Sequence, residues 1–267
     1  MKVLFIGDVV GSIGRNMLLE SLPMLKRKYR PQLTIVNGEN AASGRGITEK
    51  IYKEFLQAGV DLVTMGNHTW DNRDIFNFID NEKVKMIRPA NFPEGTPGIG
   101  YKVININQEK IAVINMQGRA LMNSLDDPFR KMDAILDEVS KETSCIFVDF
   151  HAETTSEKQA MGWYLDGRVS AVVGTHTHVQ TNDARILPKG TAYLTDVGMT
   201  GAYDSILGVE RDIIIEKFLS QLPVRHEIPE QGRKLLSGCF LEIDSSNGQA
   251  IRIENIVIND DRPFGSD

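Results

Sequence analysis

The stretch Ala171-Val172-Val173-Gly174-Thr175-His176-Thr177-His178 places two histidines directly after a short apolar run. Side chains two positions apart on an extended backbone lie on the same side. Both imidazoles are therefore predicted to face one point in space. Imidazole is a common metal ligand, so a metal site is the first hypothesis, with two polar loop residues as the alternative. The choice depends on whether the rest of the chain supplies further ligands.

The composition is that of an ordinary globular protein. The chain has 267 residues, of which 41% are hydrophobic and 25% charged, and we expect one domain over residues 1–267. The net charge of −6 argues against binding of long nucleic acid through its phosphates. No apolar run is long enough to span a membrane. The first residues, Met1–Ile6, lack the layout of a signal peptide, so a cytoplasmic location is expected.

Continuous apolar runs alternate with helical patterns through the first third of the chain. Such runs are typical of strands buried on both faces of a parallel sheet. One helix is predicted from about Gly14, with Pro23 expected to kink or end it. A second is predicted to begin after Thr48 and to end at Gly59. The alternation predicts an α/β fold with right-handed crossovers, with strands at 3–6, 33–36 and 62–65 and a short amphipathic helix at 75–79.

The rest of the chain adds more strands of both kinds. Two β-rich runs joined by a short turn predict a hairpin. Asp127 and Pro128 are typical of a helix start, and another helix is expected from Ser156 to Trp163. We predict two sheets within the one domain. The expected strands are 101–106, 110–115, 145–150, 171–173, 191–194, 236–243 and 251–258.

A metal-competent or proton-transferring side chain follows each of several predicted strands. In open α/β sheets, ligands bind beyond the carboxyl ends of the strands. Each residue alone has an ordinary explanation: Asp8 could cap the next helix, and His68 and His151 could be packed loop histidines. Their shared position favours a functional site. The residues are Asp8, Glu39, Asn40, Asn67, His68, His151, His176 and His178.

The donors other than His68 predict two metal ions. Seven oxygen and nitrogen donors are too many for one tetrahedral zinc. They suit two ions roughly 3.5–4 Å apart, of the kind used in phosphate-ester hydrolysis. Two divalent ions, balanced against Asp8, Glu39 and a bridging hydroxide, leave a positive surplus for a phosphodiester anion. Nitrogen and oxygen ligation without thiolate suits iron, manganese or zinc.

The ordered blocks of the sequence resemble those of calcineurin-like metallophosphoesterases, and most closely the YmdB-type bacterial branch of 2′,3′-cyclic-nucleotide 2′-phosphodiesterases. The resemblance covers essentially the whole chain. It implies a four-layer αββα sandwich with a dinuclear metal site on loops at the strand ends. Iron is the expected metal, with manganese and zinc as alternatives. The blocks are Gly7-Asp8, Gly38-Glu39-Asn40, Thr64-Met65-Gly66-Asn67-His68-Thr69-Trp70-Asp71, residues 88–98, Asp149-Phe150-His151-Ala152-Glu153, Gly174-Thr175-His176-Thr177-His178 and residues 195–201.

Two departures from the broad superfamily fit this branch. The first block usually reads Asp-x-His, whereas here Asp8 is followed by Val9 and Val10. The second usually supplies a bridging Asp, which Glu39 would replace. The resemblance implies one metal on Asp8, Glu39, Asn40 and His178, and a second on Glu39, Asn67, His151 and His176. Thr69 follows His68 where an acidic residue is common, so His68 is expected to lack its usual carboxylate partner.

The implied activity is hydrolysis of small cyclic nucleotides by a metal-activated hydroxide, with His68 as proton donor to the leaving oxygen. The expected substrates are 2′,3′-cyclic nucleotides, whose opening would give 3′-nucleotides, with 3′,5′-cyclic AMP and GMP as further candidates. A regulatory role in bacteria is expected. The alternatives are a phosphomonoesterase or RNA-end nuclease on the same scaffold, and a nucleotide-sensing regulatory protein. A homo-oligomer is left open.

Three other residues attract attention but have simpler explanations. Trp70 could stack on a base, although packing against the neighbouring loop is the preferred interpretation. Arg119 could contact a phosphate, although a surface ion pair is preferred. His226 lies far from any strand-end block and is expected at the surface.

Overall fold

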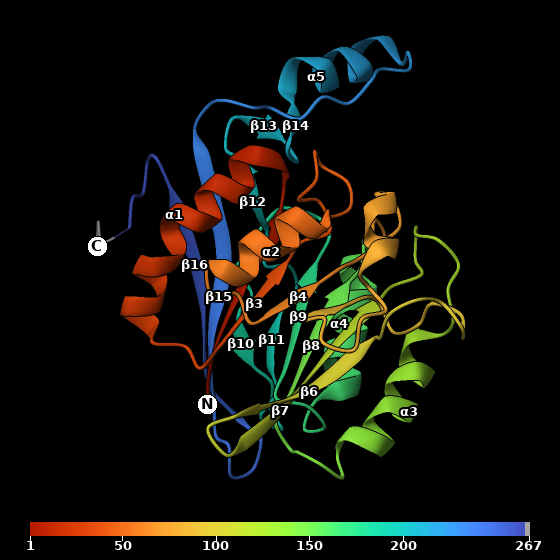
Figure 1. Ribbon diagram of the computed structural model, residues 1–267, viewed down its shortest axis with the longest axis vertical. Coiled ribbons are helices and arrows are strands. Elements are labelled where there is room, and N and C mark those ends of the chain that lie inside the picture. Colours follow the sequence, from red (N-terminus) through yellow and green to blue (C-terminus); the bar gives the residue numbers. More distant parts are fainter. Residues whose placement is uncertain (265–267) are drawn as a thin grey trace.

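The computed structural model describes residues 1–264, which form two β-sheets with helices on their outer faces (Figure 1). The first sheet has the order β2-β12-β15-β1-β3-β4-β5, with β16 paired to β15, and its strands β1, β3, β4 and β5 are parallel. Their bounds are β1 Lys2–Ile6, β2 Asp8–Val9, β3 Leu33–Asn37, β4 Leu62–Thr64, β5 Met86–Ile87, β12 Met199–Ala202, β15 Lys234–Ile243 and β16 Ala250–Asn259.

The second sheet has the order β10-β11-β9-β8-β7-β6, with β7, β8, β9 and β11 parallel. A small separate ribbon pairs β13 with β14. The bounds are β6 Tyr101–Ile106, β7 Glu109–Gln117, β8 Ile146–His151, β9 Ala171–Thr175, β10 Arg185–Ile186, β11 Ala192–Leu194, β13 Ser205–Ile206 and β14 Val209–Glu210. The helices are α1 Gly11–Tyr29, α2 Glu49–Gln57, the 3-10 helix η1 Arg73–Asn77, α3 Pro128–Val139, α4 Thr155–Leu165 and α5 Arg211–Ser220.

Three apolar clusters hold these layers together. Alternate side chains of a strand point to opposite faces of its sheet, so Phe5 of β1 points to the other sheet and meets Phe147 of β8, with 5.1 Å between ring centroids. Leu4, on the other face of β1, packs in a cluster with residues of α1 and α2. A third cluster joins α3 and α4 to the second sheet. The expected α/β fold, with helices outside two facing sheets, is observed.

Two local expectations need correction. Helix α1 begins at Gly11 rather than near Gly14, and it does not end at Pro23 but continues to Tyr29. A proline costs an interior helix a hydrogen bond, but Pro23 lies on the exposed face while Leu22 and Leu25 are buried on the opposite one. Packing of that buried face outweighs the loss. The short helix expected at 75–79 is present as the 3-10 helix η1, which begins two residues earlier at Arg73, where Asn72 Oδ1 accepts a hydrogen bond from the Asp74 N–H.

The two predicted helix starts at Thr48 and Asp127 agree with the structure, whereas the short strands β2, β5, β10, β12, β13 and β14 were not predicted. Thr48 accepts a hydrogen bond from the Ile51 N–H at the start of α2, and Asp127 caps α3 at Phe129 and Arg130. Helix α5 was not predicted. Together with β13 and β14 it projects from one end of the molecule, as Figure 1 shows.

Candidate metal centre

The polar residues that follow the strands lie at one edge of both sheets. Asp8 begins β2 directly after β1, and Glu39 and Asn40 lie just beyond β3. Asn67 and His68 come after β4. In the second sheet, His151 is the last residue of β8 and is paired in register with Thr175, the last residue of β9. The carboxyl ends of strands from both sheets therefore face a common space. The structure arranges the predicted residues in two groups, with His68 beside the first.

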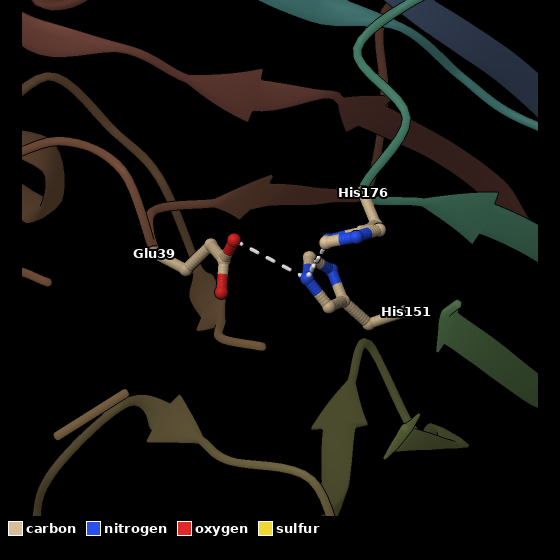
Figure 2. Close-up of side chains that lie close together, drawn as sticks. All are labelled: Glu39, His151 and His176. Carbon is tan, nitrogen blue, oxygen red and sulfur yellow. Dashed lines mark hydrogen bonds and ion pairs between the residues drawn. The ribbon is translucent and has the colours of Figure 1, made fainter. Parts of the chain in front are cut away.

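The first group surrounds the His151 ring (Figure 2). One ligand atom from each of Glu39, His151 and His176 lies within 4.8 Å of the others. His151 Nε2 is 3.2 Å from Glu39 Oε1, 3.1 Å from His176 Nδ1 and 2.8 Å from Asn67 Oδ1. The other ring nitrogen, Nδ1, is 2.9 Å from Thr175 Oγ1. The Thr175 contact orients the ring so that Nε2 points into the group.

The second group surrounds the Asp8 carboxylate. Asp8 Oδ2 is 3.3 Å from His178 Nε2 and accepts a hydrogen bond of 3.0 Å from the His176 N–H. His178 Nδ1 lies 2.9 Å from the Leu207 carbonyl oxygen. A carbonyl can only accept, so Nδ1 carries a proton, and Nε2 is the nitrogen that could release its proton and bind a cation beside Asp8. Asn40 donates from Nδ2 to the Gly44 carbonyl at 2.9 Å, so its buried Oδ1 atom is the one that could bind a cation.

Both groups have unsatisfied acceptors of the kind that a cation binds. Asp8 and Asn40 are buried, and within the described chain Asp8 Oδ1 and Asn40 Oδ1 accept no hydrogen bond. Buried acceptors without a partner are costly and rare. Around His151 Nε2, three further acceptor atoms compete for at most one proton. The donor set, carboxylate, amide oxygen and imidazole without thiolate, therefore fits hard or borderline metal ions.

The space around these groups excludes any larger residue at position 66. A Cβ atom added to Gly66 would lie 2.4 Å from both Glu39 Oε2 and His151 Nε2. Real side chains do not approach so closely, so the backbone at Gly66 is part of the wall of the site.

Burial and neighbouring charges shift the pKa values of three groups of the site in different directions. Burial opposes ionisation of Glu39, but the charges and hydrogen bonds of His151 and His68 hold the pKa of its carboxyl well below the usual range. Burial likewise opposes protonation of His178, but the hydrogen bond and charge of Asp8 raise its pKa to about 9. His176 differs, because burial and the neighbouring His151 charge lower its pKa to about 3. A bound cation would replace the protons on these rings, since imidazole ligates as the neutral form.

His68 flanks the first group. Its backbone N–H donates to Glu39 Oε2 at 2.9 Å, and its ring Nδ1 lies 2.8 Å from Asp71 Oδ2. The expectation that His68 lacks a carboxylate partner was wrong. A turn in which the Asp71 N–H donates to the His68 carbonyl brings the residue three positions later alongside the ring. This pairing leaves Nε2 as the ring nitrogen available to a substrate.

The backbone of the His176–His178 segment also differs from the prediction. Strand β9 ends at Thr175, and His176 and His178 have φ angles of 97° and 64°, both in the left-handed region. The two rings therefore do not share one side of an extended strand. His176 turns to His151 and to Glu153, with Nε2 3.0 Å from Oε2, whereas His178 turns to Asp8. A non-glycine residue in this region costs about 1–3 kcal/mol, which the surrounding contacts must offset.

Three carboxylates of the site were not predicted. Asp71 and Glu153 contact His68 and His176, and both stood inside quoted blocks of the sequence. Asp149 is fully buried within β8 and accepts a hydrogen bond of 2.7 Å from Thr175 Oγ1, which in turn contacts His151. Burial raises the pKa of Asp149 to about 7. Asp149 also opens one of the quoted blocks, and an aspartate inside an apolar strand is rare.

The simpler explanations of the other candidates agree with the structure. Trp70 stacks on Phe76 with 5.4 Å between ring centroids and meets Phe92 edge-on. Arg119 forms an ion pair of 3.0 Å with Asp127. His226 is exposed.

Comparison with known proteins identifies the family. A sequence model of the YmdB-like proteins matches residues 4–256. The chain belongs to the YmdB-like family. Its sequence is 60% identical over 264 residues to the 2′,3′-cyclic-nucleotide 2′-phosphodiesterase of Bacillus subtilis, covering 99% of each chain. A phosphodiesterase is a hydrolase, so the enzyme class expected from the sequence agrees with that of this YmdB-like relative.

Solved structures of similar proteins have the same fold. A hypothetical protein of Thermus thermophilus superimposes with a TM-score of 0.90 at 42% identity, over 97% of this chain and 99% of its own. A structure described as a novel phosphatase of Mycoplasma pneumoniae gives 0.91 at 37% identity, over 97% and 93%. The predicted YmdB-type resemblance and the mixed α/β fold are confirmed. Within residues 1–264, no helix is both long and apolar enough to cross a membrane.

Proposed function

We propose that this protein hydrolyses 2′,3′-cyclic nucleotides to 3′-nucleotides at a dinuclear metal centre. The observation that carries the proposal is that Glu39, Asn67, His151 and His176 form one group and Asp8 and His178 another, with buried acceptors, including Asn40 Oδ1, left without partners. The choice of substrate is supported by the Bacillus subtilis relative. Because both sheets supply ligands, the proposal treats residues 1–267 as one domain.

The two groups would hold one ion each. Asp8, Asn40 and His178 would bind the first, and Asn67, His151 and His176 the second. Glu39 would bridge the two ions. Its Oε1 atom faces His151, and its Oε2 atom accepts a hydrogen bond from the backbone N–H of His68. Iron is the proposed metal, with manganese and zinc as alternatives that the donor set also suits. When bound, the ions would polarise the phosphoryl group and activate water near neutral pH.

The protein's own residues would supply orientation and a proton. His68 would donate a proton to the ribose oxygen as it leaves, a contribution of about 10²–10⁴-fold in rate. Asp71 would hold Nδ1–H of His68, so that the proton for transfer is carried on Nε2. On the second group, Glu153 would accept from Nε2 of His176 and Thr175 would contact Nδ1 of His151, fixing the nitrogen that each ring presents inward.

The test is a comparison of substrates on metal-loaded protein. We expect hydrolysis of 2′,3′-cyclic AMP to 3′-AMP, with slower reaction on 3′,5′-cyclic AMP, on 3′-AMP and on an oligoribonucleotide. The Glu39→Gln variant should be inactive on all four, which excludes a contaminating enzyme. Activity on the monoester alone would contradict the proposal and favour a phosphomonoesterase.

A further inference from the structure

A buried ion pair contacts the loop that carries His176 and His178, the two histidines with positive φ angles. Lys158 of α4 and Asp196 have side chains only 2% and 1% exposed, and Nζ is 2.5 Å from Oδ2. Neither residue belongs to the candidate ligands themselves. Removing both charges from water is costly, and a pair of well-packed apolar residues in the same place would often stabilise the fold at least as much as the ion pair does. The pair therefore calls for a role besides stability.

Asp196 binds the one residue that separates the two histidines. Its Oδ2 atom accepts hydrogen bonds from the Thr177 N–H at 3.0 Å and from Thr177 Oγ1 at 2.7 Å. Its Oδ1 atom accepts from the Gly198 N–H at 2.8 Å. With Lys158, the carboxylate thus has four donors from three separate segments, which fix it in one orientation. The fixed Asp196 carboxylate therefore anchors Thr177 in one position.

The residues on each side of Thr177 are also held. The His176 N–H donates to Asp8 Oδ2 at 3.0 Å, and the His178 carbonyl accepts from the Met199 N–H at 3.3 Å. Strand β9, which leads into the loop, packs closely against Thr195 and Lys158. A Cβ atom on Gly174 would lie 1.8 Å from the Thr195 carbonyl oxygen and 3.1 Å from Lys158 Cδ. The loop is therefore fixed at three consecutive residues.

We infer that Lys158 and Asp196 are positioning residues that hold His176 and His178 apart, so that each addresses a different metal ion. This inference rests on the proposed dinuclear centre. The left-handed angles of both histidines are strained, and the Thr177 hydrogen bonds oppose their relaxation. If Thr177 is released, the loop relaxes toward an extended backbone in which both rings lie on one side. The two histidines then compete for a single ion.

The experiment measures Mn²⁺ binding to metal-free protein rather than catalysis. Asp196→Asn removes the charge that anchors Thr177, and Asp166→Asn is its control, because Asp166 is a buried carboxylate that accepts from the Lys189 N–H and lies outside the loop. Calorimetry gives the number of Mn²⁺ ions and their affinities, and electron paramagnetic resonance detects the exchange coupling of a bridged Mn²⁺ pair. Circular dichroism checks folding.

We expect two Mn²⁺ ions and a coupled spectrum for the wild-type protein and for Asp166→Asn. Asp196→Asn should bind one ion about 10–100-fold more weakly, the range for loss of an outer-shell partner, and should lose the coupled signal. A folded Asp196→Asn protein with two ions of unchanged affinity and coupling would overturn the inference while leaving the dinuclear centre intact. A wild-type protein that binds fewer than two ions would overturn the dinuclear centre and this inference with it.

A second pair of variants decides the matter if Asp196→Asn does not fold. Thr177→Ala removes only the hydroxyl donor, and Thr177→Ser keeps it. We expect Thr177→Ala to weaken one Mn²⁺ ion by about tenfold and broaden the coupled signal, and Thr177→Ser to restore both. Equal binding by the alanine and serine variants would overturn the role of Thr177 as the link.

Discussion

The two sheets build their halves of the candidate metal centre in different ways. The first sheet supplies Asp8, Glu39, Asn40 and Asn67 directly after strand ends, and none of these four has a positive φ angle. The second sheet supplies His151 from a strand end, but His176 and His178 from a left-handed loop. In the first half, strand order alone brings the ligands together. In the second, anchors outside the ligand set, Asp196 above all, must hold the loop. The histidine half should therefore be the more sensitive to remote substitutions.

Glu39→Gln should have the largest effect because Glu39 contacts both the His151 ring and the His68 backbone. We expect the metal affinity to fall by more than the roughly 10–100-fold typical of outer-shell changes, and activity to fall with it. Elemental analysis and substrate turnover on the same sample measure both. Retention of two ions and full activity would show that a Glu39 carboxylate bridging the two ions is not needed.

His68→Gln should separate chemistry from metal binding. The glutamine side chain keeps polarity but supplies no proton, so turnover of a 2′,3′-cyclic nucleotide should fall by about 10²–10⁴-fold with two ions retained. Asp71→Asn should give a smaller loss of about tenfold to 10²-fold, as expected for a misplaced catalytic group. Full activity in the His68 variant would remove it from the mechanism.

Gly66→Ala should displace Glu39 and His151 without removing a candidate ligand. The new methyl group would collide with Glu39 Oε2 and His151 Nε2, each 2.4 Å from the ideal Cβ position. A displacement of this size can cost about 10²-fold in rate. Gly95→Ala is the control for a glycine substitution, because its added Cβ meets nothing within 4 Å although its φ is also unfavourable for alanine. If both variants keep wild-type activity, the site is looser than its contacts indicate.

Arg119→Ala should have the smallest effect, because its ion pair with Asp127 is exposed and contacts neither half. Exposed pairs contribute about 0.2–1 kcal/mol. Thermal unfolding should therefore change little and turnover should stay at the wild-type level. A tenfold rise in KM would instead place Arg119 at the substrate.

The sequence was most informative where local pattern determines structure. Continuous apolar runs such as Val3–Ile6 predicted buried strands, and the polar residues after them predicted the edge at which the candidate ligands lie. Pro23 misled, because burial of the opposite face of α1 outweighs one lost hydrogen bond. Helix α5 was missed altogether, since only Ile214 among its residues is buried.

The details of the site depended on contacts between distant segments. The pattern of alternating threonine and histidine predicted an extended backbone for His176 and His178, and no local feature indicates that Asp196 binds Thr177 across 19 positions. The Asp71 partner of His68 depends on a turn that the order of residues alone did not identify. The side chains that gather at this edge were therefore largely predictable, whereas their orientations required the tertiary structure.

The central claim is most directly tested by anomalous diffraction from crystals of the protein grown with phosphate, measured across the iron, manganese and zinc absorption edges. We predict two metal peaks roughly 3.5–4 Å apart, with Glu39 between them. His178 should bind the ion beside Asp8, and His176 the ion beside His151. A single peak, or both histidines on one ion, would contradict the account.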